Sequence, residues 1–219
     1  ATLPALGTSS HQVSLTVSDA CGNLARKSVT ISGTAATRFA DMQNHWASTY
    51  TTPLNDKGII SGVTANGKTN FLPDQKITRG DFALMTANWL GLDLSRYAGV
   101  SLPYADAASI PKWDENAVKA LYAEGIMQGS KAGDGSLRAN AKASITRAEA
   151  MTILGRILPQ GYPQASLTAF SDAASVPSWS KDYVATLVEL KVVGGSNGKL
   201  DPNASVTRAE VAKMLFTLW

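Results

Sequence analysis

The chain has 219 residues, 44% of them apolar, so it is long enough to bury a substantial core. Charged residues make up 17%, the formal net charge is +3, and no Lys- or Arg-rich run occurs, which argues against a nucleic-acid partner. No apolar run approaches the roughly 18 residues that a membrane span requires, so we expect no spanning segment.

The first 36 residues differ in pattern from the rest. Polar and apolar residues alternate over His11–Ser18 and again over Lys27–Ser32, and a turn-rich connector containing Cys21 separates the two runs. This predicts a β-hairpin. Two strands alone are marginally stable in water. We therefore interpret residues 1–36 as the end of an upstream immunoglobulin-like module, which would also supply any disulfide partner of the cysteine. A short ribbon packed on the rest of the chain is the alternative.

From residue 37 onward one pattern occurs three times, which is the sign of internal repeats. Each copy holds an early aspartate, a tryptophan, a glycine 16 residues after the tryptophan, and a Thr-Arg-x-acid tetrapeptide. We divide the chain accordingly into residues 37–100, 101–164 and 165–219, called repeats 1, 2 and 3. In this order the aspartates are Asp41, Asp106 and Asp172, the tryptophans Trp46, Trp113 and Trp179, the glycines Gly62, Gly129 and Gly195, and the tetrapeptides begin at Thr78, Thr146 and Thr207.

Each tryptophan begins a predicted helix, because apolar residues recur four and eight positions later. Gly58 and Gly125 are placed to end the first two of these helices as C-cap residues, and Lys191 takes that place in the third. Pro53 lies inside the first pattern. Because proline has no amide hydrogen, we expect it to kink that helix or delay its start.

The Thr-Arg-x-acid tetrapeptide predicts the start of a second helix in each repeat. In a capping box the threonine hydroxyl accepts from the amide of the acidic residue, and the acidic side chain accepts from the threonine amide. This accounts for the threonines and the acids. It does not account for the arginines, which stand where the helix dipole disfavours a cation; they are Arg79, Arg147 and Arg208.

Two interpretations of the arginines are open. Together with the helix amides they favour a carboxylate or phosphate ligand held by the guanidinium fork. Alternatively, each pairs with an aspartate of a neighbouring repeat, and one arginine can do both. The tryptophans either pack in the core or present an indole face on which a sugar ring can stack. The glycine-rich loops are either ordinary turns or places where backbone amides approach a ligand.

The combined motifs resemble the surface layer homology (SLH) domain over about residues 38–219. The resemblance implies a mainly α fold of three repeats around a central three-helix bundle formed by the tryptophan-initiated helices, with the remaining helices and loops making three prongs. It also implies noncovalent anchoring of an exported or S-layer protein to the bacterial cell wall. The implied ligand is a secondary cell wall polymer ending in pyruvylated N-acetylmannosamine, or, in some bacteria, peptidoglycan modified with a diamine.

Carried over to this sequence, the resemblance makes the arginines, tryptophans, aspartates and glycines of the repeats the expected ligand-binding residues, in grooves between repeats. Repeat 1 departs most from the family pattern, since Gly80-Asp81 replaces Ala-Glu and a proline interrupts its first helix. We therefore expect the groove supplied by Arg79, together with Trp46, to be the weakest of the three. The resemblance further implies an extracellular location and one chain with internal pseudo-threefold symmetry, acting as a monomer.

Other classes of function fit less well. The two histidines, His11 and His45, lie in no Ser/His/Asp set, and the paired acids fall at caps and loop starts, so we expect no catalytic residue and no cofactor. Asp201-Pro202-Asn203 hints at a calcium module, but the ladder of regularly spaced acids that such a module needs is missing, so we expect no metal. A protein–protein contact in a surface lattice is the remaining alternative.

Overall fold

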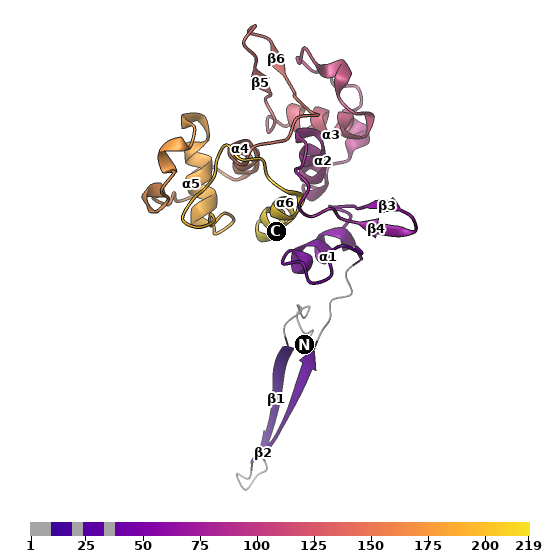
Figure 1. The fold of residues 1–219 in the computed structure, drawn as a ribbon, viewed down its shortest axis with the longest axis vertical. Coiled ribbons are helices and arrows are strands. Elements are labelled where there is room, and N and C mark those ends of the chain that lie inside the picture. The colour runs from indigo at the N-terminus through magenta and orange to yellow at the C-terminus, as the bar shows by residue number, and fades with distance from the viewer. Residues whose placement is uncertain (1–9, 19–23, 33–37) are drawn as a thin grey trace.

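The computed structural model describes residues 38–219 in full and the backbone of two strands, 10–18 and 24–32 (Figure 1). Strands β1 (Ser10–Ser18) and β2 (Leu24–Ser32) pair antiparallel, with Ser10 opposite Ser32 and Ser18 opposite Leu24. The predicted hairpin is confirmed. The connector with Cys21 lies outside the described residues, and the immunoglobulin-like origin of this segment stays a prediction.

The rest of the described chain is mainly helical, as predicted. Every repeat contributes a first and a second helix, joined by a loop that carries a small antiparallel ribbon or, in repeat 3, a single bridge between Ser196 and Lys199. The first helices are α1 (Ser48–Asp56), α3 (Lys112–Ala123) and α5 (Lys181–Glu189), and the second helices are α2 (Arg79–Trp89), α4 (Arg147–Ile157) and α6 (Arg208–Thr217). The ribbons are β3 (Val63–Ala65) with β4 (Lys68–Asn70), and β5 (Ser130–Lys131) with β6 (Leu137–Arg138).

Short 3-10 turns complete the repeats. They are η1 (Leu94–Tyr97), η2 (Ala107–Ser109), η3 (Leu167–Ala169), η4 (Ala173–Ser175) and η5 (Ser178–Ser180). No helix in the described part of the chain is both long and apolar enough to cross a bilayer.

The predicted helix ends are found. Gly58 and Gly125 follow α1 and α3 with φ of 71°, in the left-handed region where glycine carries no steric penalty. Lys191 adopts φ of 60° at the same place after α5, so repeat 3 tolerates a residue whose Cβ disfavours this conformation. Pro53 lies within α1, which begins two residues after Trp46. Since α5 also begins two residues after its tryptophan and contains no proline, the late start of α1 is not specific to proline.

A closed ring of three backbone hydrogen bonds joins the repeats. The amide of Ile77 donates to the carbonyl of Val206, that of Val206 to Ile145, and that of Ile145 back to Ile77, each over 3.1 Å. All three side chains are at least 99% buried, so these hydrogen bonds are shielded from water. The three residues each precede the threonine of a Thr-Arg-x-acid tetrapeptide. The starts of the second helices therefore meet at one point.

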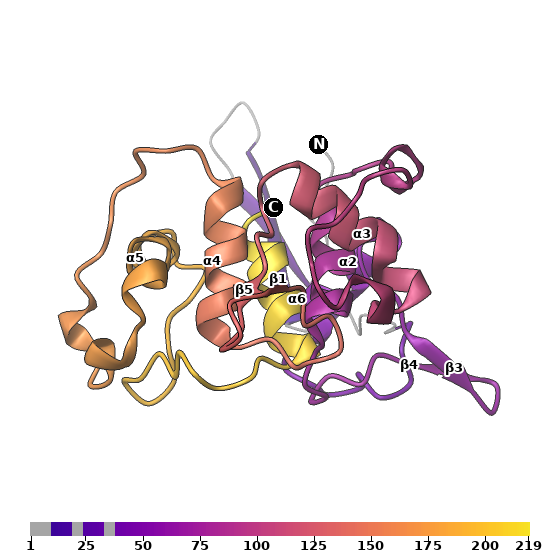
Figure 2. The same cartoon turned by 90° about the horizontal axis from the view of Figure 1, so that it is seen from above.

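The second helices, not the first, occupy the middle of the molecule. Figure 2 shows α2, α4 and α6 between α3 and α5. Helices α2 and α4 each bury seven of their 11 residues, whereas α1 and α5 each bury three of nine. The expected central bundle of tryptophan-initiated helices is therefore wrong. The apolar residues spaced four and eight positions from each tryptophan suggested a core position for the whole helix face. The tryptophan itself lies at the surface, however, and the leucine eight positions later is buried.

Each first helix packs on the second helix of the preceding repeat. Helix α3 packs on α2, α5 packs on α4, and α1 closes the circle on α6. Leu54, Leu121 and Leu187, the last residues of the three apolar stripes, are fully buried in these contacts. Each pair of packed helices in the core is thus formed by two neighbouring repeats.

Candidate functional site

The early aspartates hold the loop that leads into the second helix of their own repeat. Asp41 accepts from the amides of Phe71 and Leu72 over 2.8 and 2.7 Å. Asp106 does the same for Ala139 and Asn140, and Asp172 for Leu200 and Asp201. Burial works against ionisation of Asp172, but these amide hydrogen bonds outweigh it and lower the pKa of the carboxyl.

The arginines hold the same loops from the other side. The Nε of Arg79 donates to the carbonyl of Ala139 over 3.0 Å, that of Arg147 to Leu200 over 2.7 Å, and that of Arg208 to Phe71 over 2.8 Å. Each of these loop residues therefore has its amide bound by an aspartate of its own repeat and its carbonyl bound by an arginine of the preceding one. Both carboxylate oxygens of each aspartate thus bind the loop, and the contact of these aspartates with a ligand stays a prediction.

The helix amides are also taken by neighbouring repeats. At the start of α2, the amides of Arg79 and Gly80 donate to Ala143 and Ala141 over 2.9 Å each. Helices α4 and α6 repeat this arrangement toward Ala204 and Pro202, and toward Gln75 and Pro73. The third amide of each helix donates to the N-cap threonine. The expectation of an anion site on free helix amides is therefore wrong, because the helix starts bind backbone carbonyls instead.

The glutamates of repeats 2 and 3 bridge a helix cap and an arginine of the preceding repeat. One oxygen of Glu149 accepts from the Thr146 amide over 2.9 Å, and the other lies 3.0 Å from Nη1 of Arg79. Glu210 likewise binds the amide of Thr207 and Nη1 of Arg147, each over 2.8 Å. Two of the three predicted capping boxes are present. Ion pairs between repeats, predicted as the alternative role of arginine, form for Arg79 and Arg147, although their acid is a glutamate and not the predicted aspartate.

Repeat 1 lacks this bridge. Asp81 accepts from the hydroxyl of its own N-cap Thr78 over 2.8 Å and does not complete the capping box. Arg208, which faces this junction, donates Nη2 to the carbonyl of Ser61 over 2.8 Å and lies 4.8 Å above the ring of Phe71. Burial lowers the pKa of Arg208, and the charges of Asp81 and Asp41 oppose this effect only in part. A side chain shorter by one methylene thus leaves one of three junctions without its ion pair.

Gly80 has a packing role at the junction of repeats 1 and 2. A Cβ there would lie 2.3 Å from Oδ2 of Asp114, in α3 of the next repeat. Asp114 is 99% buried, and its Oδ1 has no hydrogen-bond partner in the described part of the chain. Burial, and secondarily the charge of Asp81, raise the pKa of Asp114 to about 7. Gly80 therefore makes room for a carboxyl group that is costly to ionise.

The three tryptophans of the motif are exposed. Trp46 is 53% exposed, Trp113 70% and Trp179 55%, so core packing does not explain them. The glycines 16 residues later lie beside the aromatic residues that stand two positions before each early aspartate. A Cβ on Gly129 would approach Tyr104 to 2.5 Å, and one on Gly62 or Gly195 would approach Phe39 or Phe170 to 2.7 Å. Only glycine fits at these three positions without a shift of the neighbouring ring or backbone.

Two open grooves bring these elements together, each from three repeats and each of about 380 Å³. We call groove A the one that holds Arg79 of repeat 1, Glu149 and Gly129 of repeat 2, and Trp179 of repeat 3. Groove B holds Arg147 of repeat 2, Glu210 and Gly195 of repeat 3, and Trp46 of repeat 1. At the third junction, between repeats 3 and 1, Arg208 reaches the carbonyl of Ser61 next to Gly62, and the acid of the tetrapeptide is Asp81.

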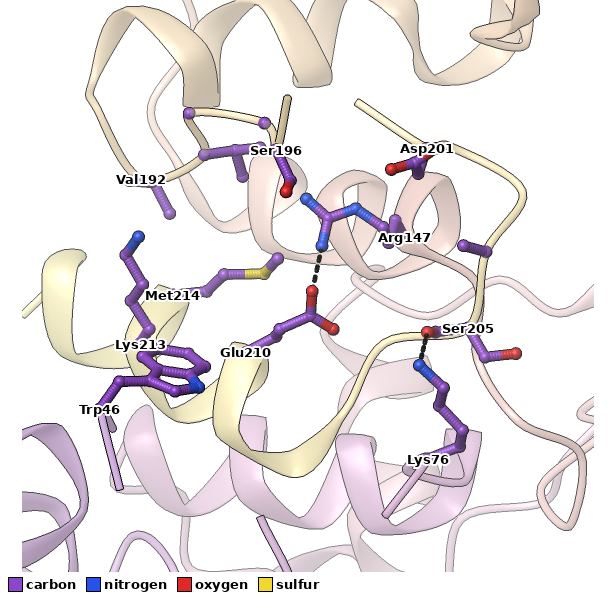
Figure 3. Close-up of a pocket in the computed structure, with 14 residues that line it drawn as sticks. Trp46, Lys76, Arg147, Val192, Ser196, Asp201, Ser205, Glu210, Lys213 and Met214 are labelled. Atoms are coloured by element: carbon purple, nitrogen blue, oxygen red, sulfur yellow. Dashed lines mark hydrogen bonds and ion pairs between the residues drawn. The ribbon is translucent and has the colours of Figure 1, made fainter. Parts of the chain in front are cut away.

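Figure 3 shows groove B. Trp46 lies beside Lys213 and Met214 of α6, while Arg147 reaches in from α4 toward Glu210 and Ser196. The Nη2 of Arg147 has no hydrogen-bond partner among the described residues, so it can still donate to a ligand. The same holds for Nη2 of Arg79 in groove A. An arginine that closes the fold can therefore also bind a ligand.

Both grooves carry an excess of positive charge. Groove A is lined by Arg79, Lys131 and Arg156 against one acid, Glu149. Groove B is lined by three cations and two acids, namely Lys76, Arg147, Lys213, Asp201 and Glu210. Lys213 and Arg156 were missed from the sequence, although their spacing of three and seven residues from the helix-start glutamate places them on the same helix face.

The expected ranking of the grooves has to be reassigned. Arg79 and Trp46 do not share a groove. Arg79 lies in groove A with Trp179, whereas Trp46 lies in groove B with Arg147. Arg79 lies in groove A with a complete glutamate bridge. The irregular Asp81 faces Arg208. Local sequence identified the irregular helix start correctly but attached it to the wrong arginine.

Comparison with known proteins agrees with this architecture. The sequence matches the S-layer homology domain family at residues 38–83, 103–151 and 169–212. It is 32% identical to an amylopullulanase of Thermoanaerobacterium thermosulfurigenes over 186 residues, which is 82% of this chain and 9% of that protein. It is 34% identical to the Surface-layer 125 kDa protein of Lysinibacillus sphaericus over 163 residues, 73% of this chain and 13% of that protein. The S-layer protein sap of Bacillus anthracis is 27% identical over 83% of this chain and 21% of its own length. The chain thus spans a small part of the relatives it matches.

The bridges between repeats should make Arg79 more important for stability than Arg208. Arg79→Ala leaves the carboxylate of Glu149 without its partner in a largely buried site, and we expect a loss of about 3–5 kcal/mol in the free energy of unfolding. Arg208→Ala removes hydrogen bonds to two uncharged carbonyls, and we expect a loss of about 1–3 kcal/mol. Urea denaturation of the two variants measures the difference. Equal losses would show that the glutamate bridge adds no stability.

Asp114 should make stability depend on pH. Its pKa rises from about 3.8 in the unfolded chain to about 7 in the fold, so the folded state binds more protons between these values. Its contribution to stability therefore declines as pH rises from about 4 to about 7, and stays low above that range. We expect the free energy of unfolding of Asp114→Asn to exceed that of wild type by about 1–3 kcal/mol at pH 8, because no buried charge is left unpaired. At pH 4 the two free energies should be nearly equal. Thermal denaturation of both proteins across this range measures the gap. A gap that does not widen with pH would refute the assignment.

Proposed function

Because the chain belongs to the S-layer homology domain family, we propose that it anchors a bacterial surface protein to the cell wall noncovalently by binding an acidic, pyruvylated secondary cell wall polysaccharide in grooves A and B. Its location is the bacterial cell surface, and its family role is attachment there. The observation that carries the proposal is an indole more than half exposed beside an open groove that also holds an arginine with a free Nη2.

The chemistry of the grooves fits an acidic sugar. An exposed indole face stacks on the C–H face of a pyranose, and arginine and lysine side chains bind a carboxylate by charge-assisted hydrogen bonds. The excess of cations in both grooves favours an anion, and it opposes peptidoglycan modified with a positively charged diamine. A binding titration with purified wall polymer before and after removal of its pyruvyl groups tests the proposal. Equal binding to both preparations would argue against recognition of the pyruvate.

The two groove tryptophans should contribute to binding far more than to stability. We expect Trp46→Ala and Trp179→Ala each to weaken polymer binding at their own groove roughly tenfold, about 1.4 kcal/mol. Their effect on unfolding should stay within about 0.5 kcal/mol because the indoles are exposed. Trp219→Ala is the matched control, since Trp219 is 57% exposed but lines neither groove. Calorimetry that finds all three variants equally affected would remove the tryptophans from the site.

We further propose that one chain is the complete binding unit, a monomer with three internal repeats. Support comes from the ring of hydrogen bonds, which closes within one chain and leaves no repeat without two neighbours. Equilibrium sedimentation should therefore return the mass of a single chain, 23.0 kDa, at micromolar concentration. An obligate trimer of chains would contradict this.

A further inference from the structure

A second cavity adjoins groove A. It has a volume of about 530 Å³ and lies between the end of α4, the loop that follows it, and α5. Gln128 and Arg156 line both this cavity and groove A, so the two spaces adjoin at these side chains. We call this second cavity the α4–α5 cavity.

The cavity lies at the junction of repeats 2 and 3. Gly155, which lines it, allows Tyr183 to lie directly on α4, where a Cβ would approach the Tyr183 ring to 2.7 Å. The corresponding residue of α6 is Phe216, which packs on Tyr50 with ring centroids 5.4 Å apart. Where α4 has Gly155, α6 therefore has a large aromatic side chain, and α2 has Ala87.

Arg156 is a cation without an acidic partner between the two spaces. Its Nη1 donates to the carbonyl of Ile126 over 3.1 Å, and its guanidinium lies 5.9 Å from the centre of the Tyr183 ring. No carboxylate of the described residues forms an ion pair with it, and its Nε and Nη2 are free to donate. The residues at the same place on α2 and α6 are Asn88 and Thr217, both neutral. The charge, like the cavity, is found at this junction.

The remaining lining combines aromatic rings with hydroxyl, amide and carboxylate groups. Tyr162 is 40% exposed, Tyr183 is partly buried, and Gln164, Asp182 and Thr186 complete the polar lining. A few polar groups around aromatic surface are suited to a ligand with many hydroxyls and apolar C–H faces. A sugar ring has these properties, whereas a purely apolar ligand would leave these polar groups unpaired.

We propose that groove A and the α4–α5 cavity form one extended site that binds two consecutive units of an acidic polysaccharide. The acidic unit lies in groove A, with its carboxylate within reach of Arg79 and Arg156. The next unit lies against Tyr183 and Tyr162. This inference rests on the proposed function, and it makes groove A the site that discriminates chain length, while groove B binds one unit.

The experiment compares two synthetic probes by calorimetry: the methyl glycoside of pyruvylated N-acetylmannosamine, and the same sugar extended by one N-acetylhexosamine. Trp46→Ala serves as the background, because it weakens groove B and leaves groove A to report. We expect the disaccharide to bind about tenfold more tightly than the monosaccharide. In the same background, Tyr162→Ala with Gln164→Ala should abolish this advantage and leave monosaccharide binding unchanged, since neither residue lines groove A.

The outcomes separate the two proposals. If neither probe binds, the proposed function fails. If the monosaccharide binds and the disaccharide binds no better, or if its advantage survives in the Tyr162→Ala, Gln164→Ala variant, the extended site is wrong while the proposed function stands. Trp219→Ala in the same background controls for the loss of an exposed aromatic residue elsewhere.

Discussion

The hydrogen-bonded ring of Ile77, Val206 and Ile145 is the constraint on which the rest of the structure depends. It brings the three helix starts to one point, and from there the arginine at the first position of each second helix reaches the loop of the following repeat. The aspartate of that repeat binds the same loop residue from the opposite side. Two charged residues of the motif thus fix one peptide between repeats, and the direction of every contact around the ring is the same.

This directional contact explains why each groove is composite. Groove A takes its arginine from repeat 1, its glycine loop and glutamate from repeat 2, and its tryptophan from repeat 3, and groove B shifts each of these contributions by one repeat. The functional side chains are consequently held by the same contacts that close the fold. Arg79 and Arg147 each bind a glutamate and a carbonyl and keep Nη2 free. The same guanidinium can therefore stabilise the fold and bind a ligand. In repeat 1 the shorter side chain of Asp81 binds the hydroxyl of its own N-cap residue. Arg208 is therefore left with two backbone carbonyls and the ring of Phe71 as its contacts.

The sequence was sufficient for features that depend on neighbours along the chain. The threonine caps, the left-handed residues Gly58 and Gly125, and the alternating strands before residue 33 were all predictable from local spacing. Which helices are central, and which arginine meets which acid, was not, because these depend on contacts between residues more than 50 positions apart. The tryptophan stripe misled for the same reason: helical spacing identifies one face, but it does not say how far along the helix that face stays covered.

The packing of α1 on α6 has a consequence for how the chain folds. Residues 48–56 find their partner in residues 208–217, so the first helix completes its core contacts only after almost the entire chain is present. Contacts this distant in sequence have a high entropic cost of loop closure, and they slow folding compared with a bundle of sequential neighbours. We therefore expect α2 with α3 and α4 with α5 to form early as local pairs. The exposed apolar face of α1 then makes the incomplete chain prone to association until the circle closes.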